Sequence, residues 1–163
     1  MIAINLISPE KYLNKSIESL EKFKLIKVEG TISSHDKTYS SNYFDKSTLL
    51  FCTKEFKSLR VSADNNDSIK SIFFSTTTKI GVESYEKLVE EYGLPSQMIK
   101  MEELKEVRNF SNDAYTSMAY ESSTLNCHFE DNPLIITWDK QNFLLEIHMD
   151  YQKDISFISF RVK

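Results

Sequence analysis

The C-terminal part of this chain alternates apolar and polar side chains, and this pattern restricts the fold more than any other feature of the sequence. Four segments share the pattern: residues 125–129, 134–138, 143–149 and 156–162. A period of two predicts half-buried strands. The polar turns at residues 139–142 and 151–154 are too short for crossovers, so consecutive strands are expected to run antiparallel.

Residues 69–95 predict a strand followed by a helix. Residues 69–76 are rich in β-forming side chains, and the period then becomes helical. The apolar stripe of this helix is expected to consist of Val82, Tyr85, Val89 and Tyr92. Gly93 can adopt a positive φ after the last helical residue, and Pro95 prevents the helix from continuing.

The N-terminal half adds one more helix and several strands. Ser8 as N-cap and Pro9 at the first helical position predict a helix whose stripe includes Leu13, Leu20 and Phe23. A strand is expected over residues 25–33, with Ile26, Val28 and Ile32 facing inward, and an edge strand near residues 39–44. Further strands are expected at residues 49–53 and 58–63, and residues 64–68 have the composition of a hairpin turn.

Residues 98–120 have a different pattern, in which apolar side chains keep helical spacing. Met98, Met101 and Val107 favour a helix to about Phe110, and a short helical turn could follow over residues 114–120. The predicted fold class is therefore α+β, with twisted antiparallel β-sheet meanders and two to three helices packed on one face. At 163 residues, the chain is expected to form a single domain over residues 1–163.

The acidic residues are concentrated in the second half of the chain. Residues 83–131 contain eleven acidic side chains and four basic ones, whereas residues 1–81 carry a small basic excess. Such a field would repel nucleic acid and attract a basic protein. The alternative is that these glutamates only solvate exposed helix faces.

No catalytic or cofactor motif is present in the sequence. Three glycines, at positions 30, 81 and 93, cannot form a dinucleotide or phosphate-binding loop, so no cofactor is expected. His128 and His148 fall on outward strand positions near Glu130, Glu146 and Asp150, but their spacing matches no metal-ligand motif. We expect no metal site and no enzymatic activity. An enzyme with an unfamiliar site around His128, His148 and Glu146 is the reading left open.

The sequence also bears on compartment. The apolar run at residues 1–7 is too short to span a bilayer and lacks a basic flank, so we expect no signal peptide and no membrane interaction. Cys52 and Cys127 lie in strand-like runs and are expected to be buried thiols of a cytoplasmic protein, without a disulfide.

A nucleic-acid surface would need basic side chains beside exposed rings. Lys54, Lys57 and Arg60 lie near Phe51 and Phe56 in the sequence, but they equally suit a charged sheet edge that resists strand addition. We expect no nucleic-acid partner.

The acidic, Tyr-bearing segment of residues 102–121 is the best candidate surface. Acidic side chains there would attract a basic partner, and aromatic side chains would anchor it. The candidate partner-binding residues are Glu102, Glu103, Glu106, Asp113, Tyr115, Tyr120 and Glu121.

In its size, its missing signal, its acidic region and its helix-then-strands layout, the chain resembles bacterial immunity proteins of contact-dependent growth inhibition and related polymorphic toxin systems. Those are small cytoplasmic α+β proteins that bind and block a toxin domain, often a basic nuclease. The resemblance implies an inhibitor that neutralises a cognate basic toxin domain. The alternative, a non-enzymatic accessory module of a larger bacterial or phage assembly, would pair a sheet edge with another chain.

Overall fold

The computed structural model describes residues 2–6, 8–28, 37–42, 47–101, 105–112, 115–121 and 124–163. The strands are β1 (Ile2–Asn5), β2 (Ile26–Val28), β3 (Lys37–Asn42), β4 (Ser47–Phe51), β5 (Lys54–Ala63), β6 (Ile69–Thr76), β7 (Gln97–Met101), β8 (Lys105–Asn112), β9 (Tyr115–Glu121), β10 (Thr124–Asn126), β11 (Ile135–Asp139), β12 (Phe143–Asp150) and β13 (Ile155–Val162). The helical elements are the α-helix α1 (Val82–Tyr92) and the 3₁₀ segments η1 (Pro9–Tyr12), η2 (Ile17–Phe23) and η3 (Phe129–Asp131). Among the described residues, no helix is both long enough and apolar enough to cross a membrane.

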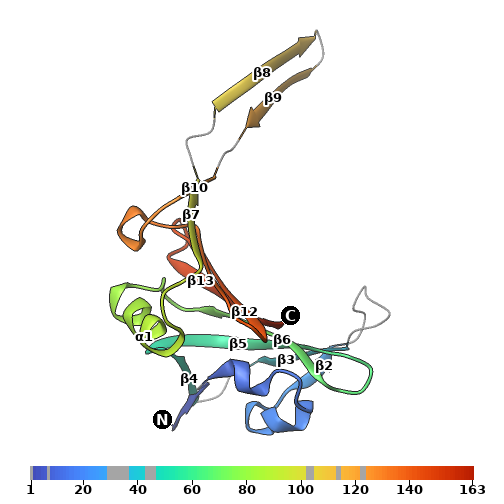
Figure 1. The fold of residues 1–163 in the computed structure, drawn as a ribbon. Helices are drawn as coiled ribbons and strands as arrows, with labels where there is room; N and C mark the ends of the chain where they lie inside the picture. Colours follow the sequence, from blue (N-terminus) through green and yellow to red (C-terminus); the bar gives the residue numbers. More distant parts are fainter. Residues whose placement is uncertain are drawn as a thin grey trace.

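The fold is α+β and is dominated by a sheet of eleven strands, most of them antiparallel (Figure 1). Its order is β1-β4-β5-β6-β13-β12-β11-β7-β10. Strand β5 is long enough to pair with both β4 and β3 along one side, and β2 then pairs with β3. The pair of β6 with β13 joins the N-terminal strands to the C-terminal meander.

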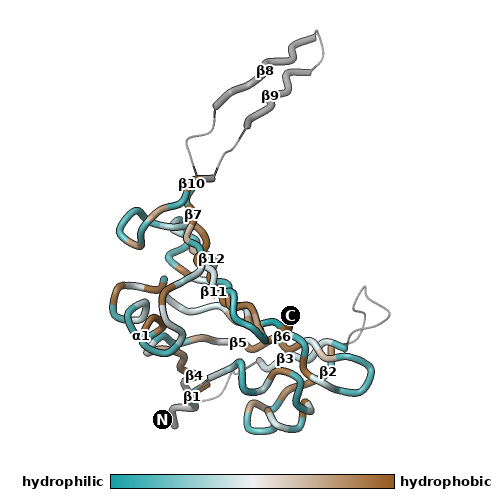
Figure 2. Tube along the Cα trace, in the orientation of Figure 1, coloured by the Kyte–Doolittle hydropathy of each residue, from teal (hydrophilic) through white to brown (hydrophobic). Residues whose placement is uncertain are grey.

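Two rows of directly paired apolar side chains cross the five central strands. The first row is Leu59, Phe74, Ile158, Ile147 and Ile136, and the second is Val61, Ile72, Phe160, Leu145 and Trp138. Each of these side chains is at most 1% exposed. Because side chains alternate along a strand, all ten lie on one face of the sheet. Figure 2 shows that the β5–β6 turn is hydrophilic.

The helical elements cover the buried face of the sheet. Leu88 of α1 and Leu20 and Phe23 of η2 are fully buried in the same core. Phe51 of β4 packs edge-on against two other core rings. Its ring centroid lies 5.1 Å from that of Phe74 and 5.8 Å from that of Phe160. The predicted arrangement of helical elements on one face of an antiparallel sheet is confirmed, but the described chain has a single α-helix rather than two or three.

The helix that precedes Gly93 is confirmed, although it buries a different face from the predicted one. Gly93 takes φ +75° and ends the helix, and its carbonyl accepts a hydrogen bond of 2.7 Å from the indole Nε1 of Trp138. The buried residues of α1 are Ser84, Leu88 and Tyr92, whereas Val82 is 60% exposed. Ser84 is polar, so a search for apolar spacing does not include it. The predicted buried face is therefore rotated slightly around the helix axis from the observed one.

The predicted N-terminal helix is wrong in type. It consists of the two 3₁₀ segments η1 and η2, and Ser8 has φ 48° and makes no side-chain cap to η1. The residues between the segments are held in a bridge to the start of β6, since the backbone of Asn14 and Lys15 hydrogen-bonds to Ile69. This tertiary pairing replaces the bonds that a continuous helix would have made.

Two predicted strands are also corrected. Ile26 and Val28 of β2 are exposed rather than inward, because within the described residues β2 pairs with β3 alone and lies at an edge of the sheet; Ile32 lies outside the described residues. The predicted strand at residues 125–129 ends at Asn126, and η3 follows it.

The helices predicted between residues 98 and 120 are wrong. Residues 97–101 form β7, which pairs with β11 and β10, and the following segment forms β8 and β9. Met98 and Met101 are three residues apart, a spacing that strands also allow. Pairing with two neighbouring strands therefore decides the conformation of this segment.

We predict that Leu88→Ala lowers the free energy of unfolding by about 3 kcal/mol, because it removes a fully buried side chain and leaves a cavity under α1. Urea denaturation followed by circular dichroism measures this change. Leu94→Ala is the matched control, since Leu94 is 78% exposed, and it should change the free energy by less than about 0.5 kcal/mol. Equal losses in the two variants would contradict the assigned core.

Candidate functional site

The segment singled out in the sequence forms an insertion between two paired strands. Met101 of β7 lies directly opposite Thr124 of β10 in an antiparallel ladder, so the chain leaves the sheet at Met101 and returns at the neighbouring position. Within residues 102–123, β8 and β9 pair with each other as a separate two-stranded sheet. This sheet pairs with no other strand in the described part of the chain.

The structure places four of the seven candidate partner-binding residues in this hairpin. Glu106 lies in β8 opposite Tyr120 of β9, and Tyr115 and Glu121 occupy the two ends of β9. Glu102, Glu103 and Asp113 lie outside the described residues. The backbone register therefore brings one predicted acidic residue and one predicted aromatic residue to the same position of the ladder.

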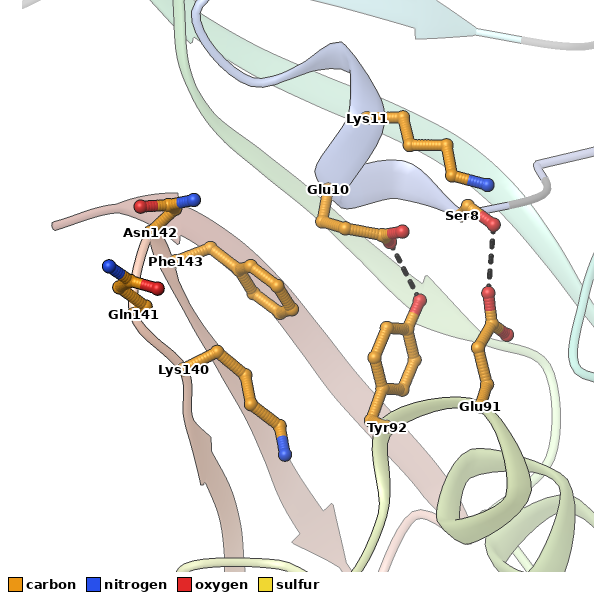
Figure 3. A pocket seen from close by; sticks show the side chains of 9 residues that line it. All are labelled: Ser8, Glu10, Lys11, Glu91, Tyr92, Lys140, Gln141, Asn142 and Phe143. Atoms are coloured by element: carbon orange, nitrogen blue, oxygen red, sulfur yellow. Dashed lines mark hydrogen bonds between the residues drawn. The ribbon is translucent and has the colours of Figure 1, made fainter.

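A cavity of about 530 Å³ lies at the β11–β12 turn, at the opposite end of the β11–β12 hairpin from this insertion. Figure 3 shows the side chains that line it. Three separate segments line it: η1 and the residue before it, the last turn of α1, and the β11–β12 turn. The lining residues are Ser8, Glu10, Lys11, Glu91, Tyr92, Lys140, Gln141, Asn142 and Phe143. No motif in the sequence pointed to this cavity, because its residues are far apart in the chain and ordinary within each segment.

Two hydrogen bonds between side chains fix the carboxylates of the cavity. The Tyr92 hydroxyl donates to Glu10 Oε2 over 2.8 Å, and the Ser8 hydroxyl donates to Glu91 Oε1 over 2.8 Å (Figure 3). Burial of the phenol, together with its hydrogen bond to Glu10, raises the pKa of Tyr92 well above 10. Tyr92 thus stays a neutral donor at physiological pH, and Glu10 keeps its second carboxylate oxygen for other partners.

A smaller cavity of about 290 Å³ lies under α1 and contains Cys52. Burial, with a smaller contribution from the Glu91 carboxylate, raises the pKa of the Cys52 thiol to about 12. The thiol is therefore protonated at neutral pH and is a poor nucleophile. Cys52 and Cys127 are both free thiols and only partly buried.

The histidines of the alternative enzyme hypothesis do not form a cluster with Glu146. His148 is exposed and lies between Ile135 and Phe157 on the neighbouring strands, whereas Glu146 forms an ion pair of 2.8 Å with Arg161. His128 precedes η3, where its backbone N–H donates to Asp131. Within the described residues, no group of three or more His, Cys, Asp or Glu side chains is arranged to hold a metal ion.

The aromatic residues weighed for nucleic-acid binding belong to the core. Phe51 and Phe56 are almost fully buried, so neither ring can stack on a base. The exposed side of the sheet carries a different aromatic pair, Phe73 and Phe157, whose rings stack at 6.1 Å.

Comparisons of the chain with family models, curated proteins and solved structures found no match. The functional argument therefore depends on the residues and geometry described above.

We predict that Tyr92→Phe lowers the free energy of unfolding by about 1 kcal/mol at about pH 8, because it removes the hydrogen bond to Glu10. The pKa of Tyr92 is higher in the folded than in the unfolded chain. The contribution of the hydroxyl is therefore complete below about pH 10 and is lost as the pH rises above that value. Urea denaturation at about pH 8 and about pH 10.5 should show the difference between wild type and variant shrinking.

Tyr12→Phe provides the control, since the Tyr12 hydroxyl makes no hydrogen bond to another described residue. It should leave both stability and its pH dependence unchanged. The assigned role of the Tyr92 proton would be contradicted if wild type and Tyr92→Phe differed in free energy of unfolding by the same amount at both pH values.

Proposed function

We propose that this chain is a non-enzymatic binding protein that recognises a basic protein partner through residues 102–121. Most concretely, it would act as an immunity-type inhibitor that neutralises a basic toxin domain by direct binding. The observation that carries the proposal is the insertion of the β8–β9 hairpin between β7 and β10 as a sheet of its own.

The construction of the hairpin supports a role in binding. An isolated two-stranded hairpin is marginally stable in water, because it buries little apolar surface. β8 and β9 make no ladder with the large sheet, and the β7–β10 pair is continuous up to the point where the insertion begins. A partner that packs on the hairpin would add stabilising contacts beyond the β8–β9 ladder.

The charge of the segment favours a basic partner. Residues 102–121 contain five acidic side chains and two basic ones. An acidic surface accelerates the encounter with a basic protein, and salt screens this attraction over about 8 Å at physiological ionic strength. In an inhibitor of this kind, the acidic side chains steer the encounter and aromatic side chains such as Tyr115 and Tyr120 fix the complex.

A second candidate function is supported by the free edges of the hairpin. β8 and β9 each pair on one side within the described residues, so each could add a strand from another chain. This is the mode expected of an accessory module in a larger assembly. The two functions differ in salt dependence, because strand addition relies on main-chain hydrogen bonds rather than on charge. They also differ in the expected position of the gene. The gene of an immunity protein lies directly downstream of that of a large secreted toxin, whereas the gene of an accessory module lies inside a phage or secretion operon.

We predict that the insertion is required for binding and dispensable for folding. Since Met101 and Thr124 are directly paired, an Asn-Gly turn can replace residues 102–123 and close the β7–β10 hairpin. The product of the adjacent gene is the partner to test, by co-purification and by surface plasmon resonance. The shortened chain should unfold within about 1 kcal/mol of the full chain and lose binding. Retained binding, or a chain that no longer folds, would contradict the proposal.

We predict that reversing the charge of Glu102, Glu103 and Glu106 to Lys slows association at least about tenfold at low salt, with a smaller effect on dissociation. The association rate of the unmodified chain should itself fall steeply as salt is raised. The matched control reverses Glu83, Glu86 and Glu90 on the exposed side of α1, an equal change in net charge at another place. A salt-independent rate, or equal effects of the two triple variants, would rule out steering by the hairpin. Binding that resists charge reversal but disappears with the hairpin would indicate the accessory function.

A further inference from the structure

The cavity between η1, the end of α1 and the β11–β12 turn contains charges of both signs that do not neutralise one another. Lys11 and Lys140 line it together with Glu10 and Glu91, but the side chain of neither lysine forms an ion pair or hydrogen bond with another described residue. Seven ion pairs occur elsewhere in the described chain, so lysines of this protein pair readily where geometry allows. The unpaired charges of the cavity therefore remain available to a ligand.

The carboxylates are held in place by neutral donors. Glu10 and Glu91 accept from the hydroxyls of Tyr92 and Ser8, both of which are buried, and Figure 3 shows both carboxylates on the same side of the cavity. A neutral donor orients a carboxylate without cancelling its charge. Each carboxylate retains an oxygen that can accept from an ammonium group.

Lys140 occupies a different wall. It belongs to the β11–β12 turn, and its Nζ lies 3.8 Å from the position that a Cβ would take at Gly93, beside the C-terminal end of α1. The last turn of α1 carries no basic residue, so the negative end of the helix dipole helps to hold the Lys140 ammonium there. A ligand carboxylate can bind on the side of this ammonium that faces the cavity.

An apolar surface completes the cavity. The rings of Tyr92 and Phe143 meet edge to face with centroids 6.0 Å apart, and Phe143 is only half-buried. The volume of about 530 Å³ lies in the range of small-molecule sites.

We propose that this cavity binds a zwitterionic ligand of the amino-acid or dipeptide class. The ligand's ammonium contacts Glu10 and Glu91, its carboxylate contacts Lys140, and its side chain packs on Phe143. The site is independent of the proposed partner surface, because the insertion leaves β7 at the other end of the β11–β12 hairpin.

The test uses the full chain and glycyl-L-phenylalanine as the probe, with its N-acetylated and C-amidated forms as matched ligands. Isothermal titration calorimetry should show saturable binding of the zwitterion, and blocking either end should weaken it about tenfold or more. In Lys140→Ala, the carboxylate and amide forms should bind alike within about twofold, whereas in the double variant Glu10→Gln/Glu91→Gln the free and acetylated amines should converge. These two convergences assign each end of the ligand to its side chain.

Lys153→Ala and Glu83→Gln serve as controls, because both residues are exposed and lie outside the cavity. They should leave all four affinities within about twofold. The proposal is overturned if no saturable binding appears up to about 10 mM, if blocked and free ligands bind equally, or if the control variants reproduce the effects of the cavity variants. The hairpin-replaced chain should still bind the probe, so failure of the proposed partner surface would not be mistaken for failure of this site.

Discussion

Two rows of apolar side chains that run across five strands are the interaction on which the rest of the structure depends. They join β5 and β6 from the first half of the chain to β13, β12 and β11 from the second. All ten side chains are essentially removed from water. Because burial on this scale is the main favourable term in folding, the helical elements and the outer strands are positioned by it. Both candidate sites lie where strands of this sheet end. One is the insertion that follows β7, and the other is the cavity at the β11–β12 turn.

The parts of the fold that the sequence predicted well are those in which local pattern and pairing agree. Buried side chains alternate along β12 and β13, and a shift of one residue would turn Leu145 and Phe160 to solvent, so the register of these two strands is fixed by the core. β7 differs, since its residues Met98 and Met101 allow either a helix or a strand. Its place between β11 and β10 is a long-range property that no local window contains. In α1, a buried serine concealed the true packing face.

The two candidate sites also differ in how far the sequence predicts them. Composition identified the acidic segment of residues 102–121, but its described residues form the paired strands β8 and β9 rather than helices, and the ladder places Glu106 directly opposite Tyr120. The cavity near Tyr92 could not be predicted, because Glu10, Glu91 and Lys140 become neighbours only after the sheet has formed. Its carboxylates are oriented by buried hydroxyls, a feature that sequence spacing does not encode.

The central claim is that the β8–β9 hairpin is a surface of this chain that binds a partner and is not part of the chain's own core. Amide hydrogen exchange measures this directly, because it reports local opening strand by strand. In the free chain, amides of Lys105–Asn112 and Tyr115–Glu121 should exchange orders of magnitude faster than those of Ile69–Thr76 and Ile155–Val162, and they should become protected when the partner binds. Protection of the hairpin in the free chain equal to that of β6 and β13, or no change on complex formation, would contradict the account.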